Sequence, residues 1–321
     1  MIHETYTVRI AAKRIEATDI CSFELVTLDG NRLPPFSAGS HVDVHVPGGM
    51  TRQYSLCNDS TESHRYLICV LNDPATRGGS KSMHEALHEG DELGISAPKN
   101  HFQLVHEARR SVLLAGGIGI TPILCMAERL ATTGADFDLH YCTRSAARTA
   151  FKSRIERSTF ASKVQFHFDD GAALQKLDAA ALLAEPRPGT FLYVCGPKGF
   201  MDWVLGTARA NGWPEAQLRF EFFSAEVAVH DADASFEVKL ASSGRVIVVA
   251  RDKAVVQALA EAGVEVPTSC EQGVCGTCLT RVIGGEPDHR DMVLTPAEQQ
   301  ANDQFTPCCS RAKSAMLVLD L

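Results

Sequence analysis

Five of the 11 cysteines in this 321-residue chain fall within its last 52 residues. Three of them form the motif Cys270-x4-Cys275-x2-Cys278, and Cys308 follows after 29 intervening residues. Because the total is odd and the N-terminus has no export signal, a disulfide framework is not expected, and clustered thiols then favour metal binding. The other six cysteines are scattered over the first 223 residues, where an isolated cysteine is usually a small core residue.

The spacing of the late cysteines distinguishes between metals. Four thiolates with x4 and x2 spacing are the plant-type pattern of a [2Fe–2S] cluster. Zinc also binds four cysteines, but zinc ribbons usually pair two Cys-x2-Cys knuckles and this region has one. Gly273 and Gly276 give the loop the flexibility to bend around one cluster. The spacing therefore predicts a [2Fe–2S] centre, while Cys309 beside Cys308 leaves the fourth ligand open.

The distribution of charge also separates the cysteine-rich C-terminal region from the rest of the chain. Residues 1–223 hold 23 basic and 25 acidic residues, whereas residues 224–321 hold 8 and 14, a net charge of −6. The small, acidic stretch between them reads as an exposed linker. The predicted boundaries are a first domain at 1–107, a second at 108–223, a linker at 224–234 and a third domain at 235–321.

Each part has its own hydrophobic pattern. Short alternating runs in the first hundred residues predict an antiparallel barrel or sandwich, with strands at 5–10, 22–28, 41–46, 66–71 and 91–96. Strand and helix then alternate, as in a parallel α/β domain. The strands are expected at 111–117, 138–144, 164–168 and 191–197, and the helices at 123–134, 150–158 and 199–212. Strands at 236–241 and 245–250 and a helix at 255–263 precede the cysteine loop.

Composition excludes several functions. The net charge of −8 argues against a nucleic-acid binder. No run of about 20 apolar residues could span a bilayer, and the N-terminus has no signal-peptide core. We therefore expect a cytoplasmic protein that binds neither nucleic acid nor membrane.

The motif Arg52-Gln53-Tyr54-Ser55 lies at the end of a predicted strand. It offers an aromatic ring for an isoalloxazine, a cation and a hydroxyl, although four residues alone are weak evidence and more often form an ordinary strand end. Some 20 residues later, Arg77-Gly78-Gly79-Ser80-Lys81-Ser82 opens a predicted helix at 83–88. Free backbone N–H groups at such a helix start can bind an anion.

A glycine loop, Ala115-Gly116-Gly117-Ile118-Gly119-Ile120-Thr121-Pro122, follows a buried strand and precedes a helix. It departs from the full G-x-G-x-x-G fingerprint at Pro122, but its context suits a pyrophosphate. Cys195-Gly196-Pro197 ends a later strand. Arg144 follows another predicted strand, at the position where the adenine ribose of a dinucleotide would lie. An acidic residue there would favour NADH and several arginines would favour NADPH, so one arginine without an acid does not distinguish the two cofactors.

The segment SCEQGVCGTCLTRVIGGEPDHRDMVL, with the later CCSRAKSAMLVLDL, is similar to the ferredoxin domain of the phthalate dioxygenase reductase family. That family includes the reductase components of vanillate demethylases and related Rieske oxygenases. The resemblance covers essentially the whole chain, since the other motifs follow in the family's order. It implies an antiparallel β-barrel flavin domain, an α/β parallel-sheet NAD domain and an α+β, β-grasp ferredoxin domain.

The resemblance also implies roles for single residues. The cluster ligands would be Cys270, Cys275, Cys278 and Cys308. Cys308 is favoured over Cys309 because in the family one residue separates the ligand from the Ser-Arg-Ala-Lys segment. Cys195 would lie near the reacting nicotinamide and Thr121 near the flavin, as positioning residues. The flavin would be FMN, bound by Arg52, Gln53, Tyr54, Ser55, Gly79, Ser80, Lys81, Ser82 and Phe223. NADH would be bound by Gly116, Gly117, Gly119, Pro122, Arg144, Gly196 and Pro197.

The expected function is therefore that of a monomeric reductase component. It would pass electrons from NADH, in preference to NADPH, through FMN to the [2Fe–2S] cluster and on to a Rieske-type terminal oxygenase. Two alternatives stay open: a stand-alone flavin and iron–sulfur reductase serving another acceptor, and a zinc-stabilised interaction module without enzymatic activity.

Overall fold

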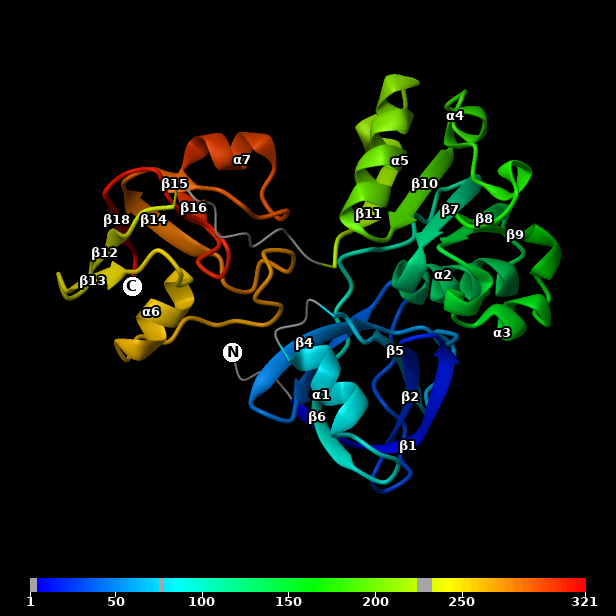
Figure 1. Ribbon diagram of the computed structural model, residues 1–321, viewed down its shortest axis with the longest axis horizontal. Coiled ribbons are helices and arrows are strands. Elements are labelled where there is room, and N and C mark those ends of the chain that lie inside the picture. The colour runs from blue at the N-terminus through cyan, green and yellow to red at the C-terminus, as the bar shows by residue number, and fades with distance from the viewer. Residues whose placement is uncertain (1–4, 75–77, 224–232) are drawn as a thin grey trace. The chain divides into compact units, whose positions relative to one another are not determined.

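A computed structural model describes residues 5–74, 78–223 and 233–321. The chain forms two compact units, residues 1–221 and residues 222–321 (Figure 1). The first unit holds two sheets and the second unit holds one main sheet with a short two-stranded ribbon. The predicted linker at 224–234 lies almost wholly outside the described residues.

The N-terminal sheet of the first unit is an antiparallel barrel. Its six strands have the order β4-β3-β6-β1-β2-β5, and an isolated bridge between Leu56 and Ile68 joins the two edge strands. Alternate side chains such as Phe23, Leu25 and Val44 fill its core. The bounds are β1 (Thr5–Ala17), β2 (Ile20–Thr27), β3 (His41–Val46), β4 (Met50–Ser55), β5 (Tyr66–Leu71), α1 (Gly79–Glu85) and β6 (Glu92–Ser96).

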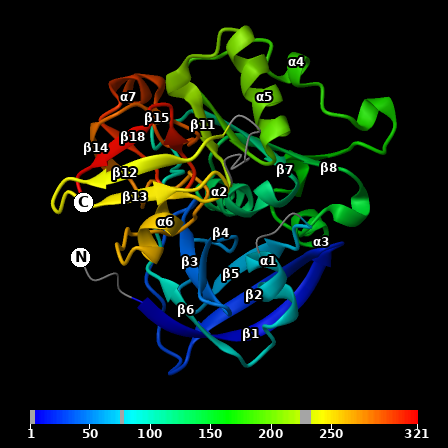
Figure 2. The same ribbon diagram turned by 60° about the vertical axis from the view of Figure 1, so that its left-hand side comes forward.

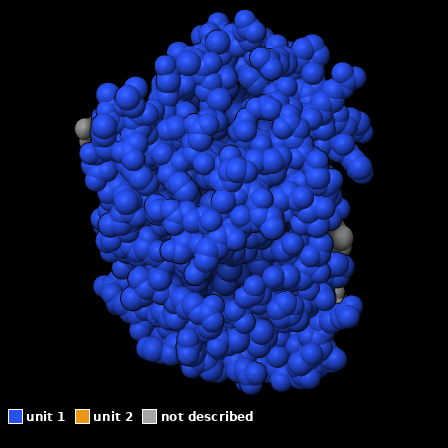
Figure 3. All heavy atoms as spheres, turned by 90° about the vertical axis from the view of Figure 1, so that its right-hand side faces the viewer, with its two compact units in different colours: residues 1–221 blue, residues 222–321 orange. Residues whose placement is uncertain are grey.

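The second sheet of this unit is parallel, with the order β11-β10-β7-β8-β9. Its central strands are buried apolar runs, as expected where helices cover a parallel sheet. The strands are β7 (Arg110–Gly116), β8 (Phe137–Thr143), β9 (Val164–Phe168), β10 (Thr190–Cys195) and β11 (Leu218–Glu221). The helices are α2 (Ile120–Thr132), α3 (Lys152–Glu156), α4 (Ala179–Leu182) and α5 (Lys198–Ala210), with 3-10 turns at 117–119, 146–148, 161–163, 173–175 and 215–217. Both sheets belong to one continuous body (Figure 3).

The second unit is a mixed sheet with the order β13-β12-β18-β14-β16, covered by helix α6, whose Val255 and Leu259 enter the core. Strands β12 and β18 run parallel and the other pairs run antiparallel. The bounds are β12 (Phe236–Leu240), β13 (Val246–Val249), α6 (Val255–Glu261), β14 (Thr280–Gly284), β15 (Pro287–Asp288), α7 (Pro296–Ala301), β16 (Gln304–Phe305), β17 (Arg311–Ala312) and β18 (Met316–Leu319). Strands β15 and β17 form the ribbon.

The expected strands and helices are present, but several differ in extent. Strand β1 runs to Ala17, seven residues beyond its predicted end, and helix α2 begins at Ile120, three residues before its predicted start. Helix α1 begins at Gly79, four residues before the predicted start, because Gly78 adopts a φ of 105° and turns the chain into the helix. Helix α3 has five residues instead of nine, since Phe151 takes a left-handed φ of 59° and prevents an earlier start. Among the described residues, no helix combines the length and apolarity that crossing a bilayer requires.

Candidate functional site

The two predicted flavin motifs lie side by side in the barrel. Helix α1 lies next to strand β4 in Figures 1 and 2, and a Cβ on Gly79 would stand 2.8 Å from Nε of Arg52. The Ser82 hydroxyl donates to the carbonyl of Pro47 at 3.0 Å, and the Ser80 hydroxyl accepts from the backbone N–H of Asp73 at 3.3 Å. The strand end and the helix start therefore form one polar surface. Arg77 of the second motif lies outside the described residues.

The remaining residues of the strand-end motif are held by neighbours. Gln53 Nε2 donates to Oδ1 of the buried Asp43 at 3.0 Å, and Lys99 Nζ lies 2.6 Å from the other oxygen of Asp43. Tyr54 is half-buried, and burial raises the pKa of its phenol, so the hydroxyl stays protonated. The motif thus offers a fixed neutral ring and hydroxyl beside the Arg52 cation.

The two predicted nucleotide motifs also meet, at the carboxyl ends of adjacent strands. Cys195 at the end of β10 pairs with Ala115 near the end of β7. A Cβ on Gly119 would stand 2.2 Å from the Cys195 carbonyl oxygen, so only glycine permits this approach. A Cβ on Gly196 would stand 3.0 Å from Cα of Gly116. A pyrophosphate-binding backbone at this edge of a parallel sheet is the arrangement expected for a dinucleotide.

Thr121 and Pro122 lie in the first turn of α2, directly after this loop, and both are buried. The Thr121 hydroxyl donates to the carbonyl of Ile118 at 3.0 Å, which braces the loop against the helix. Gly117 has a φ of 52°, and Pro197 precedes the first residue of α5.

Glu221, which sequence reasoning did not single out, connects the flavin and nucleotide motifs. It ends strand β11, where it pairs with Cys195 of β10, and its Oε2 accepts a hydrogen bond from the Ser55 hydroxyl at 3.5 Å. Burial raises the pKa of Glu221 to about 8, and the Ser55 hydrogen bond works against that rise. Burial, and then the charge of Glu221, raise the pKa of the Cys195 thiol. An acid between Phe220 and Phe222 at a strand end was the available sequence signal.

The two remaining predicted site residues, Arg144 and Phe223, are not fully buried. Arg144 is exposed just after β8, and its carbonyl accepts the N–H of Asp170 at 3.2 Å. The N–H of Asp169 similarly bonds the carbonyl of Thr143 at 3.1 Å. The two acidic residues that follow β9 are thus tied through their backbone to the end of β8. Phe223 is half-buried, two residues beyond β11.

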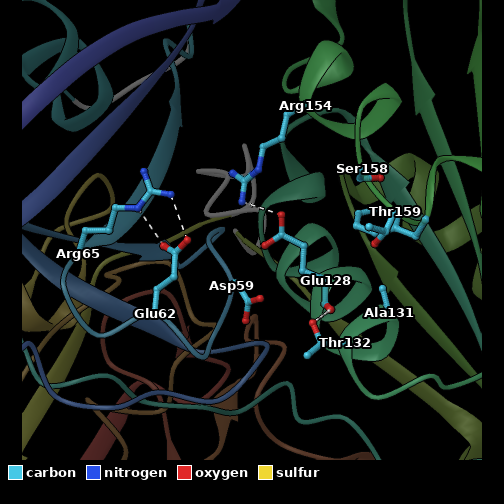
Figure 4. Close-up of a pocket in the computed structure, with 10 residues that line it drawn as sticks. Asp59, Glu62, Arg65, Glu128, Ala131, Thr132, Arg154, Ser158 and Thr159 are labelled. Atoms are coloured by element: carbon cyan, nitrogen blue, oxygen red, sulfur yellow. Dashed lines mark hydrogen bonds and ion pairs between the residues drawn. The ribbon is translucent and has the colours of Figure 1, made fainter.

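A separate cavity of about 350 Å³ is shown with its lining residues in Figure 4. Its lining includes Asp59 and Glu62 from the barrel and Glu128 and Arg154 from the parallel-sheet region. Arg154 lies 2.7 Å from Oε1 of Glu128. Burial raises the pKa of Glu128 to about 7, and Arg154 partly offsets that rise. The cavity contains none of the predicted site residues.

In the second unit the predicted cluster ligands approach one another in pairs. Cys270 and Cys275 share a hydrogen bond that lowers the pKa of Cys275, and a bond with Cys308 lowers the pKa of Cys278. Backbone N–H groups of Gln272 and Thr277 point at sulfur, 3.3 Å from Cys270 and 3.5 Å from Cys275. Among the described residues, no three potential ligands converge as a finished metal site.

This donor set still suits a [2Fe–2S] cluster, because two pairs of thiols can serve two irons and N–H groups stabilise sulfur ligands. Cys309 is buried beside this set, with Sγ 3.2 Å from the Thr306 hydroxyl. Its thiol bonds the Cys308 thiol as well as the Thr306 hydroxyl, so Cys308 stays the predicted fourth ligand.

Comparison with known proteins agrees with this reading. Residues 238–313 match the family of 2Fe-2S iron-sulfur cluster binding domains. Residues 96–218 match the N-terminal domain of proteins like dimethylamine monooxygenase subunit DmmA. A vanillate O-demethylase oxidoreductase from a Pseudomonas strain is 57% identical over 97% of this chain and 98% of its own length. The phthalate dioxygenase reductase of Burkholderia cepacia is 42% identical over 98% and 96%. The chain belongs to the phthalate dioxygenase reductase family.

The solved structure of a phthalate dioxygenase reductase agrees, with a TM-score of 0.82 at 42% identity over 99% of this chain and 98% of that one. It is described as a modular structure for electron transfer from pyridine nucleotides to [2Fe–2S]. Membership of the phthalate dioxygenase reductase family confirms the predicted fold class and the expectation of an oxidoreductase that works as a reductase component. The predicted cofactors, FMN, NADH and a [2Fe–2S] cluster, are confirmed at the level of the family. The domain boundaries and the individual site residues stay predictions.

Proposed function

We propose that this chain transfers electrons from NADH, by way of FMN and a [2Fe–2S] cluster, to the terminal oxygenase of a Rieske-type system. When bound, FMN converts a two-electron hydride donation into single electrons, which the cluster carries one at a time. The observation that carries the proposal is the meeting of the barrel motif and the nucleotide motif at Glu221, Ser55 and Cys195.

The residues around that meeting point bind and orient rather than react. Arg52, with Ser80, Lys81 and Ser82 at the start of α1, provides charge and hydroxyls for the flavin phosphate, and Tyr54 offers its ring to the isoalloxazine. Phe223 would cover the flavin. The Gly116–Gly119 loop and the Cys195–Pro197 segment present backbone to NADH, with Pro122 and Arg144 beside it.

Close to the reacting atoms, the site is uncharged at neutral pH. Glu221 retains its proton up to about pH 8 and the thiol of Cys195 stays protonated. Together with the buried Thr121, these groups exclude water and orient the nicotinamide against the flavin. No general acid or base dyad is required.

In the second unit, Cys270, Cys275, Cys278 and Cys308 would hold the cluster. The acidic residues of 224–321 suit a basic patch on the oxygenase, since opposite charges speed encounter. We place the protein in the cytoplasm as a monomer, without nucleic-acid or membrane partners.

The test uses a cluster-ligand variant of the full chain. Cys275→Ala is expected to abolish reduction of cytochrome c or of the oxygenase while rapid reduction of the flavin by NADH persists in stopped-flow measurements. Cys21→Ala, at a scattered cysteine of the barrel, is the control and should keep both activities. Loss of flavin reduction as well in Cys275→Ala would refute a serial path.

A second acceptor class has support from one relative. A tetrachlorobenzoquinone reductase of Sphingobium chlorophenolicum is 41% identical over 95% of this chain. A stand-alone reductase serving another acceptor therefore remains the alternative. Comparison of turnover with a purified Rieske oxygenase and with a soluble quinone separates the two functions.

A further inference from the structure

His41 is a buried histidine that belongs to none of the sequence motifs. It is the first residue of β3, where it pairs with Ser55 of β4, and its backbone also bridges to Lys99. Only 4% of its surface is exposed. A histidine enclosed at the end of the barrel motif calls for a hydrogen-bonding role, because burial without one is costly.

The two carboxyl oxygens of Glu221 face two different barrel residues. Oε2 lies 3.5 Å from the Ser55 hydroxyl, and Oε1 lies 4.0 Å from Nδ1 of His41. Among the described residues, Nε2 of His41 is buried without a hydrogen-bond partner. Nδ1 is the ring nitrogen that faces the Glu221 carboxyl, and an Nδ1 that accepts leaves the ring proton on Nε2. Hydrogen bonds at such sites are often long in the free protein and shorten once substrate is bound.

The charges around the pair favour its neutral form. Burial lowers the pKa of His41 to about 4, with Lys99 and His101 acting in the same direction and Asp43 opposing them. Burial raises the pKa of Glu221 to about 8. At neutral pH a carboxylic acid, which can donate, thus faces an imidazole nitrogen, which can accept. Ser55 already donates to Oε2, so the acidic proton belongs on Oε1.

We propose that His41 is a positioning residue that holds the proton of Glu221 on Oε1 through Nδ1. With that proton fixed, Oε2 accepts from Ser55, and the Ser55 oxygen is left to accept a hydrogen bond from the flavin site. His101 is exposed, and its ring lies 5.5 Å from that of His41. The inference rests on the proposed function, because the orientation of Ser55 matters only if a flavin lies beside it.

The first test follows the imidazole itself by nitrogen NMR of histidine-labelled protein, with the His41 signals assigned by their loss in His41→Gln. In the wild type, the Nδ1 shift should change with an inflection at about pH 8, as Glu221 ionises. In Glu221→Gln that inflection should be lost. An unchanged titration of His41 in Glu221→Gln would overturn the inference.

The second test is the pH profile of flavin reduction by NADH. His41→Gln should move its inflection away from about pH 8, whereas His45→Gln, at an exposed histidine on the same strand, should leave it in place. An unmoved profile in His41→Gln contradicts the positioning role. If the wild type is not reduced by NADH, the proposed function fails, while the NMR comparison still decides whether His41 holds Glu221.

Discussion

The hydroxyl of Ser55 donates to Oε2 of Glu221 at 3.5 Å, joining residues 166 positions apart. Ser55 ends the barrel motif and Glu221 ends the last strand of the parallel sheet, beside Cys195. The bond therefore connects the proposed flavin site with the proposed nicotinamide site inside one compact unit.

Removal of the Ser55 hydroxyl should slow flavin reduction. A hydrogen bond at an active site is worth about 1.4 kcal/mol, so Ser55→Ala should lower the rate of reduction by NADH about tenfold. Because this bond opposes the rise in the pKa of Glu221, the inflection of the pH profile should also move above about pH 8. Stopped-flow reduction across pH measures both effects.

The control for this substitution is Ser22→Ala. Ser22 donates to Glu16 at 2.6 Å elsewhere in the same barrel, so its loss removes a similar bond away from the site. If flavin reduction by NADH slowed equally in the two variants, the cause would be a general change in the barrel and not the loss of the bond to Glu221.

The close approach of Gly119 to Cys195 predicts a strong effect of one added methyl group. Gly119→Ala would place Cβ 2.2 Å from the Cys195 carbonyl oxygen and 2.6 Å from the Gly196 nitrogen. Backbone atoms cannot move aside cheaply, so the variant should lose about 3 kcal/mol of stability and bind NADH more weakly. Thermal unfolding and NADH titration measure these losses.

Gly206→Ala is the matched control, because Gly206 lies within α5 and a Cβ there meets nothing within 4 Å. This variant should gain about 0.5–1 kcal/mol from its higher helix propensity. A neutral Gly119→Ala variant would show that the loop is not packed as described.

The choice between two adjacent cysteines is testable by iron content. Cys308→Ser should lose the visible absorption of the cluster and its iron, because a four-thiolate site is left with three ligands. Cys309→Ser should keep both, since Cys308 is the predicted fourth ligand. The reverse pattern would assign the fourth ligand to Cys309.

Glu128 should make stability depend on pH. Its folded-state pKa of about 7 lies above the unfolded value of about 4.3, so the folded protein retains a proton that the unfolded chain releases. Its contribution is fully present below about pH 4.3 and is lost as pH rises to 7. From pH 5 to pH 8 the wild type should therefore lose about 2 kcal/mol more than Glu128→Gln, in urea or thermal unfolding.

Glu156→Gln is the comparison for this effect, because Glu156 forms an exposed ion pair with Lys152. It should follow the wild-type dependence on pH. Parallel curves for the wild type and Glu128→Gln would contradict a raised pKa at Glu128.

Local sequence patterns predicted the separate domains of the protein. Strand periodicity predicted the barrel and the parallel sheet, because alternation and buried apolar runs are local properties of a few consecutive residues. The cysteine spacing indicated the [2Fe–2S] domain for the same reason, since three of its ligands lie within one short loop. The helix at 150–158 was overextended because one left-handed residue, Phe151, is invisible to periodicity.

The contacts between the barrel and the parallel sheet, and between motifs within each, follow from the tertiary structure alone. It places Arg52 against Gly79, Asp170 beside Arg144, and Ser55 and His41 on either side of Glu221. These contacts join residues far apart in the sequence, and their register depends on how whole strands pair and pack. No local pattern carries that information. Glu221 between two phenylalanines marks an acid at a strand end, but it does not indicate that this acid reaches Ser55.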